Sequence, residues 1–105
     1  MKKYQCIITI TPRSKGQNVV EASKRSGAQG GTIVYGKGSG TAETKKFFSG
    51  LLEPEKAMVI TLVETTKVEA VKKGIEEALH IGEIGKGVLF VLDVEDVVGL
   101  TKIDT

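Results

Sequence analysis

The sequence predicts an α+β protein of the ferredoxin-like type, with a four-stranded antiparallel sheet and two helices on one face. Three observations predict it: four short β-rich runs, two stretches of helical periodicity, and their order β-α-β-β-α-β within 105 residues. In about 100 residues this order most simply gives that arrangement. We therefore expect a single domain over residues 1–105, and the composition requires no second one.

The first strand is expected over Tyr4–Thr11, where β-branched residues alternate and a proline ends the run. Ser14 with Gln17 resembles a capping box, which marks the start of a helix. Gly27 is a natural C-terminal stop. A helix over about 15–26 follows from these signals.

Three further strands are expected at Thr32–Tyr35, Ala57–Val63 and Val88–Val94. The last two are apolar on both faces, although the two helices can cover only one face of the sheet. Soluble monomers rarely expose large apolar patches. We therefore expect other copies of the chain to cover the open face.

The second helix is expected to begin at a capping box formed by Thr66 and Glu69 and to continue to about His80, because apolar residues recur at helical spacing. Gly74, inside this helix, is interpreted as permitting close packing on the sheet. His80 is expected to interact with carbonyl groups at the helix end.

The composition excludes several classes of protein. With one cysteine, Cys6, and one histidine, an internal disulfide and Cys/His metal spacing do not arise. No apolar run reaches the roughly 18 residues of a membrane span, and no signal-peptide pattern opens the chain, so we expect a cytoplasmic protein. Residues 1–46 carry a charge of +7 and residues 47–105 a charge of −5, but no basic run with interleaved aromatics indicates nucleic-acid binding.

Two glycine clusters, in residues 30–40 and 82–87, adjoin β-rich runs. Spaced glycines allow backbone N–H groups to approach an anion closely, although tight turns alone also explain them. In the predicted topology both clusters lie at the same end of the sheet, on opposite edge strands about 14 Å apart. A shared binding site therefore needs the long middle connection or a neighbouring subunit. The candidate ligand-binding residues are Gly36, Lys37, Gly38, Ser39, Gly40, Gly82, Gly85, Lys86 and Gly87.

The connection over residues 37–56 is long for a compact domain, and such connections are often functional. It carries four apolar residues, Phe47, Phe48, Leu51 and Leu52. Either they fold back onto the body of the protein or they form a surface that docks a target.

These features together resemble the PII signalling family and its PII-like relatives. The resemblance spans about residues 1–100 and rests on the Met1-Lys2-Lys3 opening, on Gly38-Ser39-Gly40, on the spacing Gly82-x-x-Gly85-x-Gly87, and on Val91-Leu92-Asp93-Val94. It implies a homotrimer that buries the open sheet faces. It also implies that residues 37–56 form a shortened T-loop, that Ile81 to Lys86 form the B-loop, and that effectors bind between subunits.

Several positions depart from the nitrogen regulators of this family. Thr41-Ala42 replaces an Arg-Gln pair, Lys86-Gly87-Val88 replaces Asp-Gly-Lys, and Gly99 and Thr101 replace two arginines. These substitutions argue against combined ATP and 2-oxoglutarate sensing. The remaining glycines, with Lys37 and Lys86, still suit a small anionic effector, and an adenine nucleotide is the candidate.

We therefore expect a trimeric regulatory protein that binds such an effector in clefts between subunits and signals through residues 37–56 to a target such as a membrane transporter. The main alternative is a metal-tolerance or assembly protein of the same trimeric architecture. A small enzyme is disfavoured, because Glu43, Glu83, Lys37 and Lys86 provide no matched carboxylate pair, triad or nucleophile. No catalytic or metal-binding residue is predicted.

Overall fold

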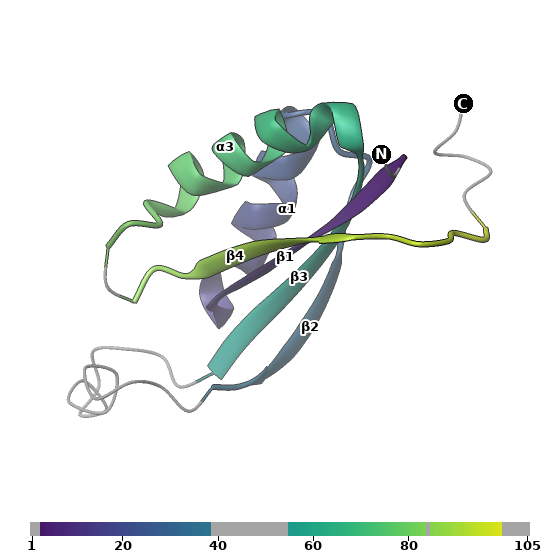
Figure 1. Ribbon diagram of the computed structural model, residues 1–105. Helices are drawn as coiled ribbons and strands as arrows, with labels where there is room; N and C mark the ends of the chain where they lie inside the picture. Colours follow the sequence, from purple (N-terminus) through teal and green to yellow (C-terminus); the bar gives the residue numbers. More distant parts are fainter. Residues whose placement is uncertain (1–2, 39–54, 84, 100–105) are drawn as a thin grey trace, which may run out of the picture.

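The computed structural model describes residues 3–38, 55–83 and 85–99, and Figure 1 shows a curved sheet with both helices on one side. The strands are β1 Tyr4–Pro12, β2 Thr32–Lys37, β3 Glu55–Glu64 and β4 Val88–Asp93, and the α-helices are α1 Gly16–Arg25 and α3 Val68–Leu79. The sheet order is β2-β3-β1-β4, and all neighbouring strands are antiparallel. The predicted ferredoxin-like order of elements is confirmed.

Both helices begin differently from the prediction. A turn of 3₁₀-helix precedes each one, η1 at Arg13–Lys15 and η3 at Thr65–Lys67. The N-cap residues are Lys15 and Lys67, so Ser14 and Thr66, the predicted capping residues, each lie one residue before the N-cap. The physical reason is that the tighter turn already satisfies a backbone donor: the N–H of Gly16 donates to the carbonyl of Arg13.

The connection between β2 and β3 is shorter than predicted, because three of its residues belong to strands. Lys37 pairs with Glu55 at the last register position of β2 and β3, and Lys56 pairs with Gly36. Residues 39–54 lie outside the described part of the chain. The predicted segment 37–56 is therefore corrected at both ends.

The core lies between the helices and one face of the sheet. Its fully buried side chains include Ile7 of β1, Val59 of β3, Val19 of α1, and Val71 and Ile75 of α3. Val63 and Leu79 extend the same cluster. The covered face of β1 therefore consists of its odd-numbered residues from Ile7 onward, which include the buried threonines Thr9 and Thr11.

The other face of the sheet is apolar, and no helix of the described residues covers it (Figure 1). The registers place Cys6 between Leu62 and Leu92, and Ile8 between Ile60 and Phe90. Met58 and Val88 flank Ile10 in the same way. Val88, Phe90 and Leu92 are 51%, 42% and 49% exposed, so the open face has the hydrophobic patch that the sequence predicts.

Gly74 permits close packing, but against a helix rather than the sheet. A Cβ atom at this position would overlap the Ser26 hydroxyl and lie 3.5 Å from the Ala22 carbonyl oxygen. Both residues lie at the end of α1. The predicted role of Gly74 in close packing is therefore confirmed, but its packing partner is the end of α1 and not the sheet.

Candidate functional site

The described residues of the predicted binding set lie at one end of the sheet. We call it the loop end: here β2 ends at Lys37, β3 begins at Glu55, β1 ends at Pro12 and β4 begins at Val88. Because β2 and β4 are the two edge strands, Lys37 and Lys86 lie at opposite edges of the sheet, about 14 Å apart at three strand spacings. Within one chain the two glycine clusters therefore do not meet.

The turn before β4 is held against the end of β1. The Thr11 hydroxyl donates a 3.0 Å hydrogen bond to the carbonyl of Lys86. Gly87 has a φ of 144°, and a Cβ atom there would lie 2.8 Å from the Ile10 carbonyl oxygen. Gly85 also has a positive φ, of 81°. These two glycines are thus required by the backbone path, whether or not a ligand binds.

Gly36 and Gly82 have different surroundings. A Cβ atom at either position would meet no atom within 4 Å, so close packing within the described residues does not explain them. At Gly38 a Cβ would lie 3.1 Å from the flexible side chain of Lys56. These three positions are the ones where backbone exposure is compatible with a ligand.

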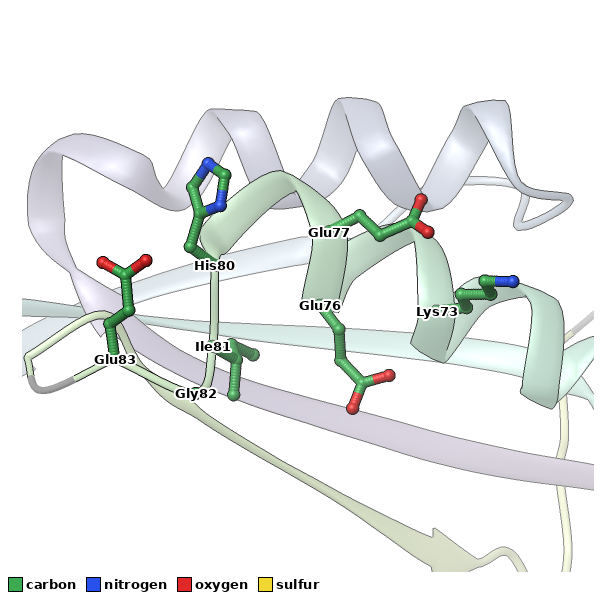
Figure 2. Close-up of a pocket in the computed structure, with 7 residues that line it drawn as sticks. All are labelled: Lys73, Glu76, Glu77, His80, Ile81, Gly82 and Glu83. Atoms are coloured by element: carbon green, nitrogen blue, oxygen red, sulfur yellow. The ribbon is translucent and has the colours of Figure 1, made fainter.

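An open hollow of about 490 Å³ lies between the end of α3 and the turn that follows it (Figure 2). It is lined by Lys73, Glu76, Glu77, His80, Ile81, Gly82 and Glu83. Within α3, Lys73 is followed by Glu76 and Glu77 at spacings of three and four, which places the three residues on neighbouring turns of the helix. Of the predicted ligand-binding residues that the structure describes, only Gly82 lines this hollow.

His80 ends α3 in an unusual backbone conformation. Its φ of 55° and ψ of 50° are left-handed, and its backbone N–H donates to the Glu76 carbonyl. In Figure 2 the His80 and Glu76 side chains point in opposite directions from the helix end. The described contacts of His80 with the helix end thus come from its backbone.

A second cluster at the loop end was missed by sequence reasoning. The guanidinium carbon of Arg13, in η1, lies 3.9 Å from the centre of the Tyr35 ring, and its Nε lies 3.7 Å from a carboxylate oxygen of Glu55. Tyr35 lies two residues before Lys37 on β2, and Lys37 is opposite Glu55. Arg13 and Tyr35 are 22 positions apart in the sequence, so local patterns do not reveal this contact.

The loop end is rich in positive charge. Lys37, Lys56, Arg13 and Lys86 come from or adjoin four different strands at this end. Nearby negative charge comes from Glu55 and, on the turn before β4, Glu83. Such a rim attracts anions, and attraction is strongest at low salt.

Burial raises the pKa of the Cys6 thiol, which is on the open face of the sheet. The described residues contain no group of three or more His, Cys, Asp and Glu side chains placed to hold a metal ion. They also contain no helix that is long and apolar enough to cross a membrane.

Some residues of the predicted binding and docking sets lie outside the part of the chain that the structure describes. Ser39 and Gly40 of the ligand-binding set lie outside the described residues, as do Phe47, Phe48, Leu51 and Leu52 of the expected docking surface. Gly85, Lys86 and Gly87 are described and lie together in the turn before β4.

The sheet topology and the two clusters at opposite edges define a ferredoxin-like α+β protein with ligand-compatible loops at one end. Residues 4–102 match the family described as nitrogen regulatory protein P-II. The chain belongs to this family, as its sequence motifs indicated. It is also similar to the crystal structure of Arabidopsis thaliana PII bound to citrate, with a TM-score of 0.71 and 27% identity over 97% of this chain and 84% of that one. No match was found among curated proteins.

Proposed function

We propose that this chain is a homotrimeric regulatory protein of the cytoplasm that binds a small anionic effector in clefts between subunits. The observation that carries the proposal is the apolar open face of the sheet, bordered at the loop end by Lys37 and Lys86 on opposite edges. Association through this face removes the exposed patch and brings the edge strand of one subunit toward that of the next.

The trimer rests on the chemistry of the open face. Ile8, Ile10, Ile60, Phe90 and Leu92 form a continuous apolar surface across three strands. At roughly 25 cal/mol for each Å² of apolar surface buried, covering such a face favours association strongly. Members of the P-II family provide the precedent for three copies rather than two.

The effector site is proposed to combine Gly36, Lys37 and Gly38 of one subunit with Gly82, Lys86 and the backbone of the turn before β4 in its neighbour. The lysines supply charge and the glycines supply exposed backbone donors. A relative that binds citrate supports an anionic effector. An adenine nucleotide is the other ligand of this class, because phosphate and carboxylate oxygens are recognised by the same donors.

Signalling is proposed to pass through the connection between β2 and β3. An effector that binds one state of this connection more tightly than another shifts the balance between them, and an effector that binds both equally shifts nothing. Phe47, Phe48, Leu51 and Leu52 are the proposed contacts with a target, for which a membrane transporter is the candidate.

Thermal unfolding and sedimentation test the proposal together. The purified protein is heated with citrate, ATP, ADP, AMP, cyclic AMP, 2-oxoglutarate, bicarbonate or divalent metals. Ligand at a hundred times its dissociation constant adds about 2.7 kcal/mol, a shift of several degrees for a chain of this size. The proposal expects a trimer by sedimentation and selective stabilisation by one anion. A monomer would overturn the proposal. A trimer that is stabilised by metals alone would also overturn it and would favour the assembly or metal-tolerance alternative.

A further inference from the structure

We propose that Arg13, stacked on Tyr35, is the principal ligand for the anionic group of the effector, and that Glu55 is a built-in competitor for its guanidinium. This inference rests on the proposed function and assigns a residue that the sequence motifs do not contain. It concerns a phosphate or carboxylate group bound at the β2 side of the loop end.

The first support is the way in which Arg13 is held. A guanidinium carbon 3.9 Å from the ring centre of Tyr35 must lie over the face of the ring. This position restricts the movement of the guanidinium, and the Arg13 side chain is still about half exposed, so a ligand can reach it. An arginine fixed in this way is preorganised for two parallel hydrogen bonds to a phosphate or carboxylate.

The second support is the loose contact with Glu55. The Nε–Oε1 distance of 3.7 Å is longer than the roughly 2.7–2.9 Å of a charge-assisted hydrogen bond. Both side chains are about half exposed, at 49% and 51%. Exposed ion pairs of this kind contribute little, so an anion that makes two short hydrogen bonds can displace the carboxylate.

The third support is the charge around the cluster. Lys37 is opposite Glu55 in the β2–β3 register and lies on the same sheet face as Tyr35, two residues away. The first turn of α1, which follows Arg13, contains no acidic residue. Arg13 and Lys37 therefore outweigh the single negative charge of Glu55, and this local excess of about +1 suits an anionic ligand.

The Arg13–Glu55 ion pair also relates effector binding to the connection between β2 and β3, through which signalling is proposed to pass. Glu55 is the first residue of β3, directly after the connection between β2 and β3. An anion that binds Arg13 displaces Glu55 and so removes the ion pair between η1 and the first residue of β3. Effector binding at Arg13 is thereby coupled to the contacts of Glu55, the residue at which the connection joins β3.

The test compares four variants, with citrate, ATP and inorganic phosphate as probes in separate calorimetric titrations at low salt. Arg13→Gln is expected to weaken binding of the active probe at least about tenfold, because it removes hydrogen bonds to a charged group. Arg13→Lys is expected to rescue only part of this loss, because it retains the charge without the planar donors. Glu55→Gln is expected to tighten binding about two- to fivefold, since the competing exposed ion pair is removed.

Arg25→Gln is the matched control, because Arg25 is the chain's other arginine and lies at the end of α1, away from the loop end. It removes the same charge and is expected to change affinity less than twofold. All variants should unfold within a few degrees of the original protein, which distinguishes ligand binding from a structural role. Binding of citrate alone identifies a carboxylate effector, and binding of ATP or phosphate identifies an effector with a phosphate group.

Two results would overturn the inference separately from the proposed function. Unchanged affinity in Arg13→Gln, or weaker rather than tighter binding in Glu55→Gln, removes Arg13 from the site but leaves the anion-binding protein intact. If the original protein binds none of the three probes, the inference is overturned. The proposed function is overturned as well only if the other anions of the thermal-unfolding panel also fail to bind.

Discussion

The two faces of the sheet have similar apolar residues but different surroundings. Ile7 and Ile8 are neighbours on β1, yet Ile7 is fully buried beneath the helices and Ile8 is only partly covered on the open face. The covered face of β1 even includes two buried threonines, Thr9 and Thr11. Hydrophobicity alone therefore does not reveal which face forms the core of the chain and which is available for association.

The largest expected effect comes from a charge on the open face. Phe90→Asp should dissociate the proposed trimer at micromolar concentration, because burying an unpaired carboxylate at three symmetric contacts costs several kcal/mol for each subunit. Sedimentation equilibrium measures this change. Asn18→Asp on the exposed side of α1 adds the same charge and should leave the assembly intact. A trimeric Phe90→Asp protein would show that the face is not the interface.

The next effect compares the two isoleucines directly. In the dissociated Phe90→Asp background, Ile7→Ala should reduce the free energy of unfolding by about 2–5 kcal/mol, because it leaves a cavity in the core. Ile8→Ala should reduce it by less than about 1.5 kcal/mol, since its side chain is only partly covered in one chain. Urea unfolding gives both values. Equal losses would mean that the two faces contribute alike within a single chain.

A smaller contrast concerns the glycines at the loop end. Gly87→Ala should cost about 1–3 kcal/mol, because φ is positive and the Ile10 carbonyl is too close to a Cβ atom. Gly82→Ala meets no such atom and should change the free energy of unfolding by less than about 0.5 kcal/mol. Chemical denaturation of the two variants provides the comparison. If Gly82→Ala proves as costly as Gly87→Ala, the backbone account of this turn is wrong.

The smallest effect is a dependence on pH at the open face. Burial raises the pKa of Cys6 in the folded protein above its ordinary value of 9.0. The stability that this difference provides is complete below pH 9.0 and is lost as the pH rises through the folded pKa, because the unfolded thiol ionises first. Between pH 8 and 10.5 the midpoint temperature of unfolding should therefore fall less steeply for Cys6→Ala than for the original protein. Identical slopes would contradict the assigned burial.

The sequence predicted the element order well, because strand and helix periodicities are local signals. Tyr4–Thr11 and Ala57–Val63 were each found within two residues of the observed strands. The helix starts were missed because Ser14 and Thr66 fit a local capping pattern that the 3₁₀ turns override. Such turns depend on how each strand is joined to its helix and leave no distinct sequence signature.

The candidate site was predicted only in part. The end of β2, with Gly36, and the turn before β4 were correctly assigned to one end of the sheet and to opposite edges, because topology alone fixes that relation. Gly30 and Gly31 precede β2 and lie at its other end, which corrects that part of the first cluster. Arg13 was missed because its partners Tyr35 and Glu55 are distant in sequence. The structural role of Gly87 was also missed, since it depends on contact with the Ile10 carbonyl of another strand.

The most direct test of the central claim is complementation between two defective chains. Lys37→Gln impairs the β2 half of the proposed site and Lys86→Gln impairs the half before β4, so neither homotrimer should bind the effector that stabilises the original protein. After unfolding and refolding an equal mixture, a site shared between neighbours should recover in about one quarter of positions, because both intact halves then meet by chance. Calorimetric titration counts these sites. A mixture that recovers no binding would show that the site is not shared between subunits.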